Sequence, residues 1–481
     1  MLEYTGHPFV DVGIATIVAF VGKKQPQELS EADLEAIAEY MRKNYVIDPL
    51  KSFLTVAFPN SGFTQPAYNK QPEKRQIYAR RVLGAYRSDA PRLRVPGVFT
   101  GKPATALPLD VKGTLPPGRT FRQHVPLLTG EGIINFFPYG DAGLPISGEA
   151  LLALQALPLG CAKTGGRLLA VHSDDPDIIL RFARRFLQQN RKAIQVAQAM
   201  GSKKMPEPPQ RATTFFVHTL IELEQERARH EHAARPASVT AYHFSNSGQG
   251  VDLDIYHLPM EVLDFIRAAT ASTHKDAWNA LVRRGWQITR AGRRRKGAKE
   301  ETPPRFNVLY EDLLRLPDNA ATFIRTYFLR RPERKRDMRK DDPRSTYSLQ
   351  SDLNLISWPL LDLFLRKVVI MDKARIEHIR TLGDTLADYV RTENDRRFFH
   401  TFLTATRYDH VRNALIKASL ARLKRGEPPL ITFDQFIAIF EEGEDLPRFD
   451  WSLARDLVLI RMIEQLHQQG WLKSHTDILE E

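Results

Sequence analysis

Alternating apolar and polar positions near the middle of the chain predict a pair of β-strands. Residues 242–259 read YHFSNSGQGVDLDIYHLP, in which an aromatic strand, a polar loop and a second strand follow one another. Residues 251–256 alternate apolar and polar side chains, so the two sets lie on opposite faces of the strand. The loop Ser245–Gly250 is longer and more polar than a tight hairpin requires. The earlier stretch FPNSGFTQP, residues 58–66, repeats Asn-Ser-Gly and a following Gln.

A strand that runs into a helix is predicted at GGRLLAVHSDD, residues 165–175. Asp175 is suited to cap the helix, and Pro176 to occupy its first position, where no N–H is needed. The helix then carries an apolar stripe on one side and five basic residues on the other. The stripe consists of Ile178, Phe182 and Phe186, and the basic residues are Arg181, Arg184, Arg185, Arg191 and Lys192.

After residue 345 the pattern is almost purely helical. Thr432 with Gln435 fits a capping box, and Asp450 fits an N-cap. Connections are short, so we expect an antiparallel bundle. The fold class is therefore α+β and multidomain: a mixed α/β N-terminal domain over residues 1–335, an exposed charged linker over 336–345, and an all-α helical bundle over 346–481. The expected helices are Trp358–Met371, Ala374–Thr392, Asp395–Arg425, Thr432–Glu442 and Asp450–Trp471.

Length and composition add limits to this picture. A chain of 481 residues exceeds one ordinary core. No apolar run is long enough to span a bilayer, and the N-terminus lacks the pattern of a signal peptide, so we expect a cytoplasmic protein without a membrane partner. Cys161 is the one cysteine, which excludes an intrachain disulfide and a cysteine-rich metal cluster.

The formal net charge of +12 favours a polyanionic partner. Residues 283–299 hold eight basic side chains and no acidic one, and residues 325–340 hold eight against two acidic side chains. Trp286, inside the first cluster, either stacks on a base or anchors its loop to the core.

Catalytic motifs are scarce. The chain has no phosphate-binding G-x-x-x-x-G-K-[ST] and no G-x-S-x-G elbow. His172, Ser173 and Asp174 fit a strand end better than a triad, and the two imidazoles of His230–His232 point to different faces of a helix. Asp252 with Asp254 could hold magnesium for phosphodiester cleavage, which gives a metal-dependent nuclease as an alternative function. We otherwise expect no enzyme activity, no cofactor and no metal.

Four stretches in order resemble the large subunit of the type I-B Cascade, the CRISPR RNA-guided surveillance complex of bacteria and archaea, in its Cst-type branch. They are residues 5–20 (TGHPFVDVGIATIVAF), 58–66, 130–175 and 242–259. Many members carry a zinc ribbon built from two C-x-x-C pairs. The resemblance implies a degenerate ribbon-like insertion at about residues 95–165, with Phe136 and Phe137 in its core. The four ligand positions would be Gly97, Thr100, Ser147 and Ala150, none of which can bind zinc as cysteine does.

The resemblance implies a non-catalytic subunit that reads the PAM, opens the duplex and stabilises the R-loop, while guide RNA reads the target sequence. The implied partners are crRNA, double-stranded target DNA, the displaced single strand, and a helicase-nuclease or transposition adaptor. Other Cascade subunits are implied as well: the backbone, guide-5′-end-capping, guide-processing and small subunits. The system would serve antiviral defence or RNA-guided transposition. The small subunit is sometimes made from an internal start, for which Met338 is the candidate here.

The resemblance, together with side-chain chemistry, suggests the candidate DNA-binding residues. Asn and Gln can hydrogen-bond base edges, and Arg and Lys neutralise phosphates. The PAM or wedge candidates are Asn60, Thr64, Gln65, Asn246, Ser247 and Gln249. The phosphate-contact candidates are Arg283, Arg284, Arg290, Arg293, Arg294, Arg295, Lys296, Arg396 and Arg397. Two alternatives stay open: the loops are structural turns whose Asn side chains bond their own backbone, or the protein is a nucleic-acid scaffold without sequence preference.

Overall fold

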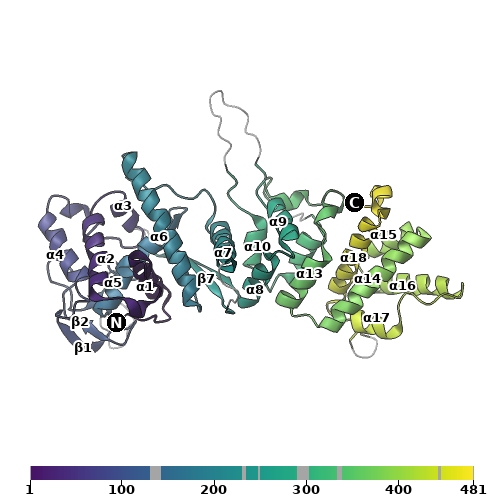
Figure 1. Cartoon of the computed structure of the whole chain (residues 1–481), viewed down its shortest axis with the longest axis horizontal. Helices are drawn as coiled ribbons and strands as arrows, with labels where there is room; N and C mark the ends of the chain where they lie inside the picture. The colour runs from purple at the N-terminus through teal and green to yellow at the C-terminus, as the bar shows by residue number, and fades with distance from the viewer. Residues whose placement is uncertain are drawn as a thin grey trace, which may run out of the picture. The chain divides into compact units, whose positions relative to one another are not determined.

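The computed structural model of the chain describes residues 2–130, 142–229, 235–246, 250–289, 303–332, 338–442 and 446–479 (Figure 1). The chain forms two compact units, Met1–Met260 and Glu261–Glu481. Strands β1–β8 lie in the first unit, and the second is helical, so the α+β class with a helical C-terminal region is confirmed. The boundary between the units lies well before the expected one at residue 335.

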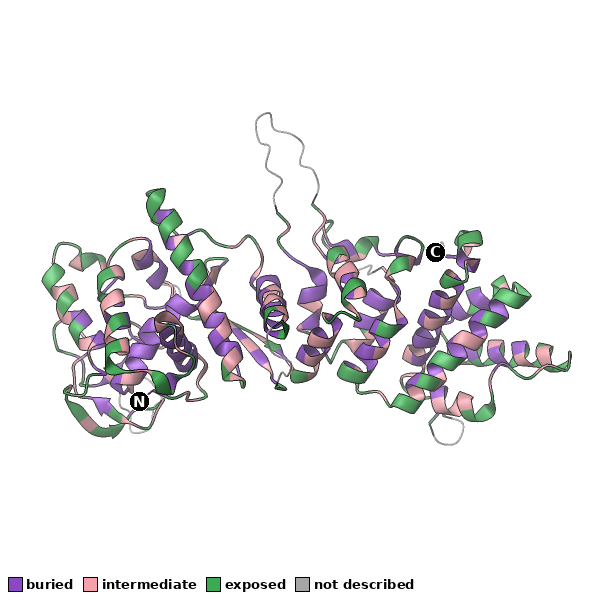
Figure 2. Cartoon of the chain, viewed as in Figure 1, coloured by how far each residue is buried: buried purple, intermediate pink, exposed green. Residues whose placement is uncertain are grey.

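Helix α1, Pro8–Val21, is the centre of the first unit. Its sequence, PFVDVGIATIVAFV, is apolar on almost every side, which is typical of a helix buried all round. It packs on α5, Gly148–Ala156, so closely that a Cβ on Gly13 would lie 2.0 Å from the Ala153 carbonyl oxygen. Figure 2 shows α1 and α5 largely buried, whereas α2 and α4 expose one side.

The predicted strand pair belongs to a four-stranded antiparallel sheet with the order β5-β6-β7-β8. The pairing of β7 with β8 runs without interruption from Val239 opposite Leu258 to Ser245 opposite Asp252. Phe9 of α1 packs on the sheet through the rings of Tyr242 and Phe244, at centroid distances of 5.9 and 4.7 Å. The bounds are β5 Ala162–Thr164, β6 Arg167–Ser173, β7 Val239–Ser245 and β8 Asp252–Leu258.

The helix after β6 begins as predicted. In α6, Pro176–Ala199, the Asp175 side chain accepts from the Asp177 N–H at 3.1 Å. The apolar stripe is buried, and its Phe rings pack on α7, Ala212–Ala228. The remaining elements of this unit are α2 Glu31–Asn44, α3 Leu50–Leu54, α4 Pro72–Leu83, β1 Arg92–Pro96, β2 Pro103–Thr105, β3 Arg119–Thr120 and β4 Leu144–Pro145.

The second unit is built around α14 and α18, which pack on each other. The capping box of Thr432 with Gln435 is present. Asp450 precedes α18, but its carboxylate binds Arg375 at 2.7 Å instead of capping the helix. The helices are α8 Met260–Ala269, α9 Lys275–Arg284, α10 Val308–Leu313, α11 Ala320–Phe323, α12 Leu349–Asp352, α13 Trp358–Phe364, α14 Lys373–Glu393, α15 Arg396–Thr404, α16 Tyr408–Leu423, α17 Phe433–Phe440 and α18 Trp451–Gln468.

The single helix expected over residues 395–425 is wrong, because the chain breaks between α15 and α16. Ala405 leaves the helical conformation, with ψ of 120°, and its carbonyl accepts from the buried Arg455 guanidinium at 2.6 Å. Arg331 binds the neighbouring Leu403 carbonyl at 2.9 Å. Carbonyls at a helix end need such partners, so two distant arginines stabilise a break that local propensity does not predict.

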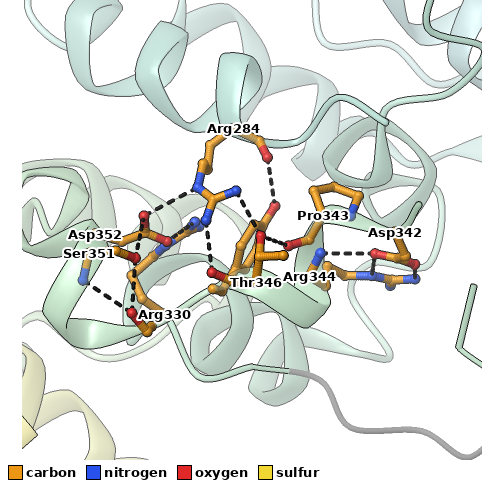
Figure 3. Close-up of polar contacts among 10 residues, drawn as sticks. Arg284, Arg330, Asp342, Pro343, Arg344, Thr346, Ser351 and Asp352 are labelled. Carbon is orange, nitrogen blue, oxygen red and sulfur yellow. Dashed lines mark hydrogen bonds and ion pairs between the residues drawn. The ribbon is translucent and has the colours of Figure 1, made fainter. Parts of the chain in front are cut away.

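A carboxylate shared by two arginines organises the start of the second unit (Figure 3). Asp352 on α12 receives the Arg330 guanidinium at 2.6 and 3.0 Å and Arg284 of α9 at 3.2 Å. Arg330 is fully buried, and its guanidinium lies 3.6 Å from the centre of the Tyr347 ring. Burial raises the pKa of Tyr347 to about 12, although the two nearby arginines oppose that shift. A charge without water is stabilised here by a carboxylate and an aromatic face.

The expected linker takes part in the same structure. Asp342 and Pro343 are buried, and Arg344 binds Asp342 at 2.7 Å and Asp312 at 2.9 Å. Residues 342–352 therefore pack on residues of the second unit that precede Met338. A product beginning at Met338 would lack Arg284, Asp312 and Arg330, and would leave Asp352 without its partners.

We expect Asp352→Ala to lower the free energy of unfolding of the second unit by about 3–5 kcal/mol, because it leaves two guanidinium groups without their carboxylate. All five tryptophans lie in this unit, so tryptophan fluorescence during urea unfolding measures it selectively. Asp388→Ala is the matched control, since Asp388 and Arg391 form an exposed pair at 3.6 Å. The control should change stability by less than about 0.5 kcal/mol. Equal effects of the two variants would contradict the assigned role of Asp352.

We expect the first unit to lose stability as pH falls from 6.5 toward 4, partly through His124. Burial lowers the pKa of His124 to about 4, and its Nδ1 accepts from the Phe121 N–H at 3.3 Å while Nε2 donates to the Leu109 carbonyl. Between these pH values the imidazole is protonated in the unfolded chain but neutral in the folded chain. This difference lowers the free energy of unfolding by up to about 3 kcal/mol at pH 4. Hydrogen exchange of α1 should show a shallower pH dependence in His124→Gln. Parallel profiles would contradict the assignment.

Candidate nucleic-acid interface

A backbone hydrogen bond joins the start of the second Asn-Ser-Gly loop to the residues just before the first. The Asn246 N–H, just after β7, donates to the Val56 carbonyl oxygen at 2.7 Å, just before the loop at residues 58–66. Neither loop is adjacent to the other in sequence, so this contact follows only from the fold. The bond ties Asn246 to the segment that leads into the loop with the candidates Asn60 and Gln65.

Within the first loop, side chains divide into internal and exposed ones. Ser61 and Thr64 are buried, and the Thr64 hydroxyl donates to the Ser61 carbonyl oxygen at 3.3 Å. Thr64 therefore stabilises the turn. Asn60 is exposed, has φ of 63°, and makes no side-chain hydrogen bond to a described residue. Its amide is the best-placed group of this loop to meet a base edge, and Gln65 is half-buried beside it.

The glycine of this loop has a packing role. A Cβ on Gly62 would lie 2.3 Å from Cγ of Tyr78, so glycine is needed for the loop to pack on that ring. Gly250 in the second loop has φ of 132° and open space around it.

Asn246 is 2% exposed, and its Nδ2 has no hydrogen-bond acceptor among the described residues. A buried donor without an acceptor costs about 1–3 kcal/mol, so the position of this amide needs a compensating contact. Within the described part of the chain, neither this amide nor that of Asn60 bonds its own backbone, which does not fit the purely structural reading of the two Asn side chains. Ser247 and Gln249 lie outside the described residues.

The phosphate-contact candidates separate into internal and surface residues. Arg284 donates to Asp352 and Thr346 and so belongs to the core network of the second unit. Arg283 and Arg397 are exposed, and Arg396 is exposed beside Asp477 at 3.3 Å. The candidates Arg290, Arg293, Arg294, Arg295 and Lys296 lie outside the described residues.

The second basic cluster is partly internal. Arg325 binds Asp456 at 2.6 Å, Arg330 is buried, and Arg331 binds a backbone carbonyl. Arg339 and Lys340 are exposed. Trp286 forms a β-bridge with Asn307, and its ring packs edge-on against Tyr310 at 6.0 Å. These contacts favour the anchoring alternative for Trp286 over stacking on a base.

The four positions that the resemblance equates with zinc ligands lie close together. The hydroxyls of Thr100 and Ser147 are 2.9 Å apart, and the Ala150 N–H donates to the Ser147 hydroxyl at 3.4 Å. A Cβ on Gly97 would lie 2.7 Å from the Ser147 nitrogen. A hydroxyl pair thus links β1–β2 to the start of α5, and no described group of three His, Cys, Asp or Glu residues could hold a metal. Phe136, Phe137, His230 and His232 lie outside the described residues.

Asp252 and Asp254 share one face of β8, as predicted, but a guanidinium lies between them. Arg167 Nη1 is 3.2 Å from Asp252 and 2.8 Å from Asp254. A cation already occupies the place where the nuclease alternative requires magnesium, so the geometry disfavours that alternative.

His172, Ser173 and Asp174 have structural partners. His172 Nε2 lies 3.2 Å from the buried Asp11, and the Ser173 hydroxyl donates to the Ser238 carbonyl oxygen at 2.6 Å. Burial alone would raise the pKa of Asp11, but hydrogen bonds from His172 and from Thr5 lower it below its usual value. These residues join β6 to α1 and to β7, and the three do not form a triad.

Sequence reasoning missed one feature of the first unit. A cavity of about 670 Å³ opens beside the start of α6, and its described lining is rich in cations. Arg184 donates to the Lys23 carbonyl oxygen there, which joins segments that are far apart in sequence. The basic face of α6 was the available signal, but its partners could not be identified from spacing. The cations of the lining are Lys24, Arg181, Arg184, Arg227 and Arg235, and the acidic residues are Asp175 and Asp177.

No described helix has both the length and the apolar character needed to cross a membrane. No protein-family model, curated protein or solved structure matches the chain.

Proposed function

We propose that this protein is the non-catalytic DNA-recognition subunit, the large subunit, of a crRNA-guided type I-B Cascade complex. In this role it reads the PAM in duplex DNA, helps to open the strands and stabilises the R-loop, while cleavage or transposition is left to a recruited partner. Its other partners are the guide RNA, the target duplex, the displaced strand and the remaining Cascade subunits.

The observation that carries the proposal is the hydrogen bond between Asn246 N–H and the Val56 carbonyl. It joins one of the four stretches that resemble the family, at Asn246, to the residue two positions before another of them, residues 58–66. Asn60 is exposed there, and Asn246 has an amide nitrogen without an acceptor in the described structure. Asn is suited to reading base edges because one amide carries both a donor and an acceptor.

The charge supports a polyanionic partner even after the internal arginines are set aside. Exposed cations remain at Arg283, Arg339, Lys340 and Arg397. The sequence has a further basic run at residues 290–299, outside the described residues. Such contacts neutralise phosphates and position the protein without reading sequence. The loops would then supply the sequence preference that a pure scaffold lacks.

We expect the isolated chain to bind duplex DNA weakly and with strong salt dependence, because each neutralised phosphate releases counterions. Affinity should fall by about 10³ between 50 and 200 mM salt if about six phosphates are contacted. Fluorescence anisotropy with a labelled duplex measures this. Replacing Arg293, Arg294, Arg295 and Lys296 by Gln should reduce the slope, while Arg380→Gln with Arg391→Gln on α14 is the control pair. A flat salt profile would contradict the electrostatic part of the proposal.

We expect Asn60→Gly to weaken discrimination among duplexes that differ next to the target site by about tenfold. Glycine keeps the positive φ of this position and removes only the amide. The measurement uses the complex purified with its co-encoded subunits and guide RNA, on a duplex library randomised beside the target. Asn394→Gly is the control for loss of an amide at positive φ, because Asn394 is also exposed and has φ of 50°. It also loses the hydrogen bond that Trp471 Nε1 donates at 3.1 Å, so circular dichroism checks its fold.

The proposal fails if the Asn60→Gly complex retains the full sequence preference and a second variant, Asn246→Asp, retains it as well. If the chain instead forms no complex with guide RNA and partner subunits, the Cascade assignment itself is overturned.

A further inference from the structure

Strand β8 leaves one of its edges open. It pairs with β7 along one side, and no strand of the described chain pairs with the other. Such an edge presents a row of unpaired N–H and C=O groups, which form a ready template for another strand. Asp252 to Ile255 are exposed, so both faces of this part of the strand are accessible.

The edge has only one of the usual protections, the charge of Asp252 and Asp254, which repels anionic segments alone. Natural proteins shorten edge strands, add charged side chains or proline, insert a bulge, or cover them. The edge at the other side of the sheet follows this rule, since β5 has three residues and is largely buried. Strand β8 has seven residues, contains no proline or lysine, and pairs with β7 in a register without a bulge.

One face of β8 is an exposed apolar ledge. Leu253 lies opposite Phe244 and Ile255 lies opposite Tyr242, so they continue the face on which Phe9 of α1 packs. Helix α1 covers that face over β7 but leaves β8 open. Val251, Leu253 and Ile255 are 51%, 38% and 56% exposed. This contiguous apolar surface has the character of an interaction site.

The opposite face of β8 is acidic. Asp252 and Asp254 share the single guanidinium of Arg167, and their side chains are 59% and 50% exposed. Two carboxylates against one cation leave a net negative charge on this face, in a chain whose overall charge is +12. A strand that pairs with β8 would therefore need apolar side chains on one face and cationic side chains on the other.

We propose that β8 binds an extended segment of a partner protein as a fifth strand, and that this segment alternates apolar with basic residues. Backbone hydrogen bonds along the open edge provide the binding, and the alternating side chains provide the selectivity. The apolar residues extend the ledge of Leu253 and Ile255, and the basic residues lie beside Asp252 and Asp254. This inference does not depend on the proposed function.

A second copy of the chain is a poorer occupant. Two β8 strands pairing with each other would place the carboxylates of both copies on one face, and like charges on neighbouring strands are destabilising. Charge complementarity therefore favours a basic segment from a different protein.

The first test uses the full chain and a short synthetic peptide that alternates lysine with isoleucine. We expect binding at one site, and about tenfold weaker binding to the double variant Asp252→Lys with Asp254→Lys. A peptide with glutamate in place of lysine should show the reverse preference. Ile255→Lys should also weaken binding, whereas Met200→Lys is the matched control because Met200 is 76% exposed on the same unit. Circular dichroism checks that each variant is folded.

The second test separates strand pairing from side-chain adhesion. Two peptides are compared, one with N-methyl groups on its odd-numbered residues and one with them on its even-numbered residues. One should not bind and the other should, because only one set of N–H groups faces β8. Equal binding of both methylated peptides, or a missing charge reversal, would overturn the proposal. Self-association of the chain that Ile255→Lys abolishes would also overturn it in favour of a dimer.

Discussion

The carboxylate of Asp352 is the interaction on which the second unit depends. It meets guanidinium groups from α9 and from the segment after α11, so three stretches separated in sequence converge on one buried charge. Arg330 has no exposed surface, and its solvation is replaced by Asp352 and by the face of Tyr347. A buried pair of this kind contributes little net stability over an apolar substitute, but loss of one member is costly. The network therefore specifies which segments belong together more than it adds stability.

This constraint changes how the positive charge of the chain should be read. Arginines at residues 284, 325 and 330 lie within basic clusters in the sequence, yet each is bound to an aspartate of the same unit. A run of like charges in a sequence indicates a polyanion site only if its counter-charges are absent in space. Here those counter-charges come from Asp352 and Asp456, which lie far along the chain. The cations left for a partner are fewer than composition suggests, and they lie mainly on exposed positions.

Local rules could be read from the sequence, and distant contacts could not. The strand alternation of β8, the Asp175 cap and the box of Thr432 with Gln435 depend on neighbouring residues, and each is present as predicted. The break after α15 depends on Arg455, which approaches Ala405 from another helix. Among candidate site residues, the sequence suggested Asn60 and Asn246, but the contact of Asn246 with Val56, near the first loop, carries no sequence signal. Thr64 was a candidate for DNA contact, but it is buried and its hydroxyl donates to the Ser61 carbonyl oxygen within the turn.

Strand β8 and the second loop belong to one hairpin, which links the two surfaces of the first unit. The ladder between β7 and β8 has no bulge from Val239 to Ser245, and a ladder of this kind is locally stiff because each residue is held across the strand. Asn246 follows directly, and its N–H donates to the carbonyl oxygen of Val56, just before the first loop. A strand added to β8 would therefore act on the same hairpin whose end, at Asn246, is bonded to Val56. Backbone hydrogen bonds thus run without a break from the open edge, across the ladder, to the segment that precedes the first loop.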